Sequence, residues 1–173
     1  MTLTVRPART HDVASIEALI EPFVSRRILL GKDPVVLYEA IQQFVVAEEG
    51  GQVVGCGALH VMWRDLGEIR TVAVAESHRG RGVGTAVVDA LEDNARELGL
   101  GRLFCLTFET DFFGARGYAV IGEVGDAAPT SDLVTAEVYA ELVRSPDEGI
   151  AEFLDLARVK PNTLGNSRMV KSL

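Results

Sequence analysis

The 173-residue chain has only two cysteines and no long apolar run, and each shortage excludes a class of protein. Cys56 and Cys105 both lie in apolar stretches, so we expect buried, reduced thiols in a cytoplasmic protein rather than a disulfide-stabilised secreted domain. No apolar run approaches the roughly 20 residues of a membrane-spanning helix. Arg6, Arg9 and Asp12 interrupt any N-terminal signal peptide. We also expect no metal site, because the sequence clusters no metal ligands.

Positive charge is scarce as well. Seventeen Lys and Arg residues face 25 Asp and Glu residues, which gives a net charge of −8 and argues against general nucleic-acid binding. A hydrophobic content of 47% with 24% charged residues is typical of a globular chain, and the length predicts one domain over residues 1–173.

A glycine-rich turn between a strand and a helix is the most informative feature that is present. The β-branched stretch 68–74 precedes Arg-Gly-Arg-Gly-Val-Gly (79–84), and a helix follows that ends at Gly99. The glycines allow a tight turn and a close approach to a ligand, and the free N–H groups of the helix's first turn attract an anion. The pattern therefore predicts a pyrophosphate site.

Three kinds of glycine loop compete for this site, beside an ordinary glycine-rich turn. A Walker A loop needs a lysine that is absent here, and the spacing does not match the Rossmann fingerprint. The remaining pattern, Arg/Gln-x-x-Gly-x-Gly/Ala, is matched by Arg79, Gly82 and Gly84 and resembles the acetyl-CoA loop of GNAT N-acetyltransferases.

The expected order of elements resembles the same superfamily. That resemblance implies an α/β (α+β) GNAT fold, with a mixed, mostly antiparallel central sheet flanked by helices and acetyl-CoA at splayed strands. Hydrophobic periodicity and turn signals predict the following elements. They are a strand (3–6), a helix capped by Thr10, a helix begun by Asp33-Pro34 with an apolar stripe to Phe44, hairpin strands (44–47 and 52–61), the strand from Glu68, the helix to Gly99, a strand (102–106), a helix (111–116), a strand (118–121), a loop (125–131), a helix (135–144), a strand or helix (152–159) and a strand (167–170).

Longer stretches are similar to the acetyltransferase domain of N-acetylglutamate synthases, in the short stand-alone form of actinobacteria. They are residues 54–60, 67–74, 104–107 and 112–118, together with 28–32, which resembles the amino-acid-binding loop, and 166–169, which resembles a polar-basic C-terminal motif. This resemblance implies acetyl transfer from acetyl-CoA to the α-amine of L-glutamate, the first step of arginine biosynthesis. The exposed hairpin and the final strand indicate a homodimer as the expected assembly. A GNAT enzyme for another amine (glutamine, a small molecule or a protein N-terminus) and a non-catalytic acetyl-CoA-binding regulator remain alternatives.

The resemblance also implies roles for individual residues. Glu68 is either the general base or a group that positions the substrate. Thr71 either forms a hydrogen bond with the substrate or a catalytic water, or is an ordinary structural residue of the strand. Side chains alternate along a strand, so these two share a face only if a bulge intervenes. Phe112 and Phe113 occupy the segment where many GNAT enzymes carry a tyrosine acid, and Tyr118 is read as a core residue. An acyl-enzyme route through Cys56 is disfavoured.

Two sets of binding residues follow from the same resemblance. The set expected to contact acetyl-CoA is Val72, Ala73, Val74, Arg79, Gly80, Arg81, Gly82, Val83, Gly84 and Thr85. The set expected to contact glutamate, whose carboxylates require cations and polar donors, is Leu29, Lys32, Arg70, Ser167 and Arg168.

Overall fold

The computed structural model describes residues 2–121, 133–154, 156 and 166–173, which divide into two compact units. Unit 1 comprises Met1–His60 and Ile69–Gly99, and unit 2 comprises Val61–Glu68 and Leu100–Leu173. The strand order is β1-β2-β3-β4-β5-β7-β6, and all four strand pairs with a defined register are antiparallel, as expected.

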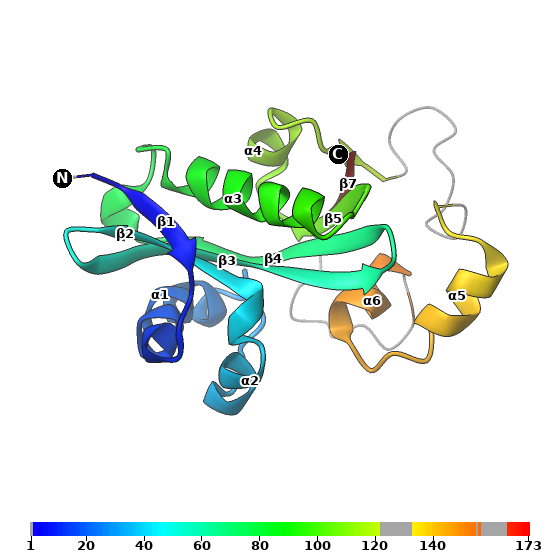
Figure 1. Ribbon diagram of the computed structural model, residues 1–173, viewed down its shortest axis with the longest axis horizontal. Helices are drawn as coiled ribbons and strands as arrows, with labels where there is room; N and C mark the ends of the chain where they lie inside the picture. The colour runs from blue at the N-terminus through cyan, green and yellow to red at the C-terminus, as the bar shows by residue number, and fades with distance from the viewer. Residues whose placement is uncertain (1, 122–132, 155, 157–165) are drawn as a thin grey trace. The chain divides into compact units, whose positions relative to one another are not determined.

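The chain passes between the units within two long strands, β3 (Gln52–Trp63) and β4 (Leu66–Val74). In unit 1, β1 (Thr4–Pro7) and β2 (Phe44–Glu49) pair antiparallel, and β2 forms a hairpin with β3. The helix α3 (Val83–Glu97) covers one face of these strands, while α1 (Val13–Ser25) and α2 (Pro34–Glu39) cover the other (Figure 1).

Local sequence signals fix most of these boundaries. Asp33 is the N-cap of α2 with a proline at the first helical position, and Gly50 and Gly51 form the hairpin turn with positive φ angles of 61° and 80°. Gly99, with a φ of 80°, follows the end of α3.

Two expected boundaries in unit 1 are wrong. Thr10 opens a short 3-10 turn, and α1 begins only after Asp12. The second helix ends at Glu39 rather than continuing its apolar stripe to Phe44. Ile41–Gln43 form a separate 3-10 turn, and Phe44 already belongs to β2, where pairing with β3 overrides the helical spacing.

Two glycines of β3 bring α3 close to the sheet. A Cβ on Gly57 would lie 2.8 Å from Val87 Cγ1 and 2.9 Å from Leu91 Cδ1, and one on Gly55 would lie 2.7 Å from Val83 Cγ1. On the opposite face, α1 contributes fully buried apolar residues to a core shared with α2 and β2. The close packing fixes the start of α3, and with it the glycine-rich turn.

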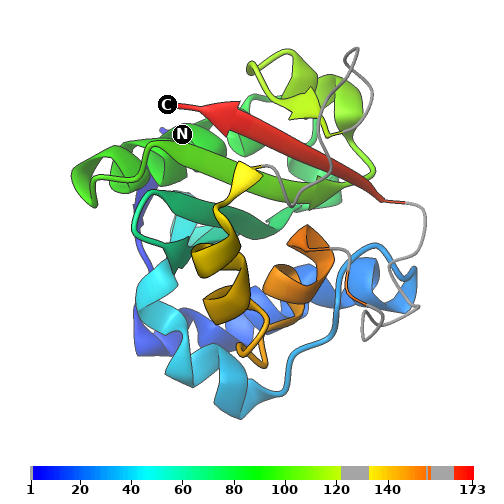
Figure 2. The same cartoon turned by 90° about the vertical axis from the view of Figure 1, so that its right-hand side faces the viewer.

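Unit 2 is built on β5 (Arg102–Thr107), β6 (Ala119–Val120) and β7 (Ser167–Ser172), with β7 paired antiparallel to both neighbours. The short helix α4 (Thr110–Gly114) lies on one side of these strands, while α5 (Ala136–Leu142) and α6 (Glu148–Phe153) lie on the other (Figures 1 and 2). Phe104 and Phe153 meet edge to face at 5.1 Å in the core beneath α6.

The ambiguous C-terminal segment is resolved in part. Asp147 caps α6 by accepting a hydrogen bond from Ile150 N at 3.1 Å, so the helix starts four residues before the expected stretch 152–159. Residues 155 and 157–159 of that stretch, and the loop expected at 125–131, lie outside the described residues. Within the described helices, none has the length and apolar character needed to cross a membrane.

Candidate functional site

The glycine-rich turn forms an open cradle at the start of α3. After β4, a 3-10 turn (Glu76–His78) leads into Gly80 and Gly82, whose φ angles are 70° and 82°. Gly82 is the left-handed N-cap of this 15-residue helix, and no described atom lies within 4 Å of a Cβ built on either glycine. Val83, Gly84 and Thr85 form the first turn, so their backbone N–H groups have no partner within the helix. The cradle therefore fits a pyrophosphate.

The two arginines of this turn have different surroundings. Arg81 Nη2 donates to both carboxylate oxygens of Glu49 at 3.1 Å, and His78 Nε2 lies 3.1 Å from the same carboxylate. Desolvation opposes ionisation of Glu49, but Arg81 and His78 outweigh it and hold the pKa of this carboxyl below its usual range. Arg81 and His78 thus tie the turn to the end of β2, whereas Arg79 lies over the ring of Phe23.

The strand β4 is irregular in unit 1. Thr71 has a φ of 57°, which is rare for a β-branched residue, and its exposed fraction is 7%. Its carbonyl oxygen accepts a hydrogen bond from Cys56 Sγ at 3.6 Å. The backbone therefore departs from regular extended geometry at Thr71, within the stretch where the alternation of side chains called for a bulge. Arg70, Val72 and Val74 are half-buried, while Ala73 is buried.

In unit 2 the Glu68 carboxylate lies against the backbone of α6. Its residue is 4% exposed, and a Cβ added to Gly149 would lie 2.7 Å from Glu68 Cδ and 2.8 Å from Oε1, and closer still to Oε2. The charge of Glu68 also reaches the neighbouring Cys105: burial first, and then this carboxylate, raises the pKa of that thiol above its usual range. A side chain at position 149 is therefore incompatible with the present position of Glu68.

The polar-basic C-terminal residues lie on β7 of the same unit. Ser167 pairs with Thr107 and Arg168 with Leu106, and the Arg168 carbonyl accepts a hydrogen bond from Ile121 N at 2.8 Å. The predicted strand (167–170) is confirmed and extends to Ser172. The register between β7 and β5 therefore fixes the positions of Ser167 and Arg168 along the sheet.

The segment with Leu29 and Lys32 follows α1 in unit 1. The Phe23 carbonyl accepts hydrogen bonds from Ile28 N at 2.8 Å and from Leu29 N at 3.3 Å, which closes the helix and starts the segment. The structure thus places Leu29, Lys32, the β4 residues from Arg70 and the glycine-rich turn in unit 1, and Glu68, Ser167 and Arg168 in unit 2.

Several side chains that competed for catalytic roles have structural surroundings. Burial raises the pKa of Cys56 to about 12, which leaves the thiol neutral at physiological pH. Tyr118 is 3% exposed and meets Phe113 edge to face at 5.2 Å, as expected of a core residue. Sequence reasoning did not find Gly149. The Asp147 cap was a local signal for a helix there, but nothing local connects that helix with Glu68.

Comparisons with known proteins agree with this geometry. The model of the acetyltransferase (GNAT) family matches residues 16–120. An amino-acid acetyltransferase of Mycobacterium tuberculosis is 55% identical over 169 residues, with 96% of this chain and 92% of that protein covered. A crystal structure of M. tuberculosis Rv2747 in complex with CoA and NLQ superposes with a TM-score of 0.88 at 54% identity, covering 98% of this chain and 99% of that one.

The likeness extends to longer enzymes. N-acetylglutamate synthase of Neisseria gonorrhoeae, complexed with coenzyme A and N-acetyl-glutamate, has a TM-score of 0.74 at 25% identity; the match covers all of this chain and 35% of that one. A Pseudomonas putida amino-acid acetyltransferase is 36% identical over 144 residues, which are 82% of this chain and 33% of that protein. Sequence, fold and the cradle at α3 together establish that the chain belongs to the GNAT acetyltransferase family.

Proposed function

We propose that the protein is an amino-acid N-acetyltransferase that transfers the acetyl group of acetyl-CoA to the α-amine of L-glutamate. The observation that carries this proposal is the 55% identity to an amino-acid acetyltransferase over 96% of the chain. The structural likeness to a synthase complexed with coenzyme A and N-acetyl-glutamate supports glutamate as the acceptor.

Acetyl-CoA is the co-substrate, and the open cradle at α3 suits its pyrophosphate. The first-turn N–H groups of Val83, Gly84 and Thr85 and the positive end of the helix dipole favour a doubly charged group. Gly80 and Gly82 keep the surface above the turn clear of side chains. Val72, Ala73 and Val74 offer the backbone groups of β4 to the rest of the cofactor.

Glu68 supplies the base in this proposal. The glutamate ammonium must lose a proton before its nitrogen attacks the thioester, and a buried carboxylate accepts that proton directly or through a water. Nitrogen then forms a bond to the acetyl carbon, the carbon–sulfur bond breaks, and CoA leaves as a thiolate. A thiol pKa near ~8.5 makes this leaving group acceptable without a dedicated acid.

The developing negative charge on the thioester oxygen needs a donor, and a backbone N–H of β4 serves this purpose. Thr71 places a hydroxyl group next to these residues. Cationic and polar side chains receive the two carboxylates of the substrate, with Lys32, Arg70 and Arg168 as cations and Ser167 as a neutral donor.

The test is thiol release from acetyl-CoA with a panel of free amino acids, comparing the wild type with Arg168→Ala. Glutamate-dependent release, with a KM for glutamate that rises at least tenfold in the variant, supports the proposal. The matched control is Arg144→Ala, since Arg144 is an exposed cation on the same unit paired only with Glu141 among the described residues. Release with other amines and none with glutamate overturns it.

A further inference from the structure

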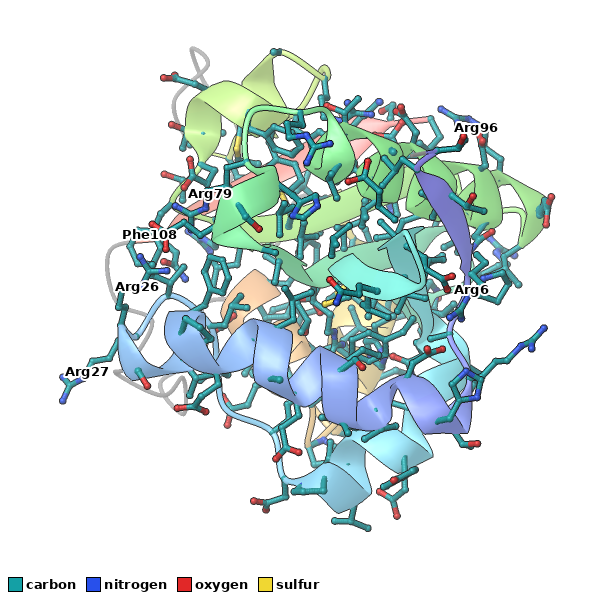
Figure 3. The ribbon with its side chains drawn as sticks, turned by 90° about the vertical axis from the view of Figure 1, so that its left-hand side faces the viewer. Arg6, Arg26, Arg27, Arg79, Arg96 and Phe108 are labelled. Atoms are coloured by element: carbon teal, nitrogen blue, oxygen red, sulfur yellow. The ribbon has the colours of Figure 1, made fainter. Side chains whose placement is uncertain are left out.

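Two guanidinium groups share one aromatic ring at the C-terminal end of α1. The Cζ atom of Arg26 lies 5.1 Å from the centroid of the Phe23 ring, and that of Arg79 lies 5.4 Å from the same centroid. Figure 3 shows both side chains at this end of the helix, with Arg27 extending away into solvent. Arg26 belongs to α1's C-cap and Arg79 to the cofactor turn, so the ring joins residues more than 50 positions apart.

Charge compensation distinguishes this pair from the other arginine of the turn. Arg81 is neutralised by Glu49. Among the residues that the structure describes, neither Arg26 nor Arg79 forms a salt bridge; Arg26 donates from Nε to the Pro22 carbonyl at 2.9 Å. In a chain with a net charge of −8, two exposed cations that contact one ring and have no carboxylate partner among the described residues form a local anion-attracting site.

The ring fixes the pair at low cost. The negative potential of the ring faces attracts each cation, which offsets part of the repulsion between the two guanidinium groups. Planar guanidinium groups offer several N–H donors in a fork that matches phosphate oxygens. The remaining repulsion is relieved when a phosphate is bound.

We propose that Arg26, positioned with Arg79 by the ring of Phe23, binds a phosphate of acetyl-CoA, as a second phosphate contact beside the glycine-rich turn. This inference rests on the proposed use of acetyl-CoA. The cofactor carries a pyrophosphate and a 3′-phosphate, and both present the chemistry that a guanidinium pair recognises. Phe23 is a positioning residue in this arrangement, and Arg26 is a binding residue from an element outside the cofactor loop.

The experiment compares Arg26→Gln with Arg27→Gln. Both variants lose one positive charge at adjacent exposed positions, but Arg27 has its own φ of 59° and lies away from the pair. We expect Arg26→Gln to weaken CoA binding about tenfold in calorimetry, the effect of losing one charge-assisted contact. The KM for glutamate stays unchanged, and Arg27→Gln binds CoA as the wild type does.

Two further arms complete the design. Titration with 3′-dephospho-CoA shows which phosphate Arg26 contacts. If Arg26→Gln and the wild type bind this ligand with equal affinity, Arg26 contacts the 3′-phosphate. If Arg26→Gln still binds it more weakly, Arg26 contacts the pyrophosphate. Phe23→Leu, which keeps an apolar side chain but removes the ring, weakens CoA binding in the same direction while the urea midpoint confirms folding.

Equal CoA affinity in Arg26→Gln and wild type overturns the inference, as does a rise in the glutamate KM with unchanged CoA affinity. Equal weakening in both arginine variants also overturns it, because a general field effect then explains the result. CoA binding is measured without turnover, so a failure of glutamate acetylation would contradict the proposed function and leave this inference standing.

Discussion

At the scale of the residue, Glu68 is buried, and its carboxylate lies against the backbone of Gly149, which has no side chain. We expect Glu68→Gln to lower kcat by about 10²- to 10⁴-fold with a small change in the KM for glutamate, because the amide cannot accept the ammonium proton. The check is the pH profile of kcat, in which the variant loses the limb that the wild type shows on the acid side. A raised KM with kcat nearly intact would instead assign Glu68 to substrate positioning.

Cys56 is the second residue with a clear chemical consequence. With a pKa of about 12 its thiol is neutral at pH 7, and its Sγ already donates to the Thr71 carbonyl. We expect Cys56→Ser to keep kcat within about threefold, since direct transfer needs no cysteine nucleophile. Steady-state kinetics check this, and thiol titration of the native protein is expected to leave the site unmodified. A burst of CoA released without any amine would contradict direct transfer.

At the scale of the element, α6 holds the Glu68 carboxylate through a glycine. We expect Gly149→Ala to lower kcat at least tenfold, because its Cβ must displace the carboxylate or shift the helix. Gly114→Ala in α4 is the matched control, because nothing described lies within 4 Å of its added Cβ and alanine favours helices by up to about 1 kcal/mol.

A double-variant cycle separates positioning from general damage. In the Glu68→Gln background, Gly149→Ala is expected to have little further effect on kcat, because the group that it displaces has already lost its function. Additive losses in the double variant would show that α6 matters to activity through a route other than Glu68.

The entry to α1 depends on an ion-pair network in unit 1. Arg6 bridges Asp12 at 2.7 Å and Glu48 at 2.8 Å, and Asp12 also accepts from Arg9 N at 2.8 Å. The hydrogen bond from Arg6, helped by that from Arg9 against the cost of burial, holds the pKa of Asp12 below its usual range.

Because the pKa is lower in the folded state, Asp12 contributes stability above the ordinary aspartate range, near pH ~4, and loses it as the pH falls through the folded value. We expect Asp12→Asn to cost about 1–3 kcal/mol at neutral pH and less in acid. Urea unfolding at about pH 7 and about pH 3 measures both values. A constant difference between the two conditions would contradict the linkage.

At the scale of the whole molecule, the last strand closes one unit. β7 lies between β5 and β6 and supplies backbone partners to both. We expect removal of residues 167–173 to abolish glutamate turnover and to lower amide protection in β5, because that strand loses one of its two neighbours in the sheet. Hydrogen exchange of the full and shortened chains checks this, with removal of Leu173 alone as the control. Retained protection in β5 would show that β7 is dispensable for unit 2.

Some elements of the fold could be predicted from the sequence and others could not. The glycine-rich turn, α3 and the β2–β3 hairpin were predicted because glycines at positive φ and apolar spacing act locally. The extension of the second helix to Phe44 failed because residues 41–43 form a 3-10 turn and Phe44 pairs with Ala58 of β3, a non-local interaction. The strained φ of Thr71 carries no sequence signal, since threonine is ordinarily a good strand residue.

Residues close together along the chain are enough to indicate the family and to predict the glycine-rich turn at the start of α3, because both depend on local pattern. The catalytic role of Glu68 stays a prediction that the family resemblance implies. Three contacts could be seen only in the folded chain: Gly149 lies against Glu68, Glu49 neutralises Arg81, and Phe23 contacts both Arg26 and Arg79. These contacts join segments 32 to 81 residues apart, and packing between such segments is set by the whole fold rather than by local pattern.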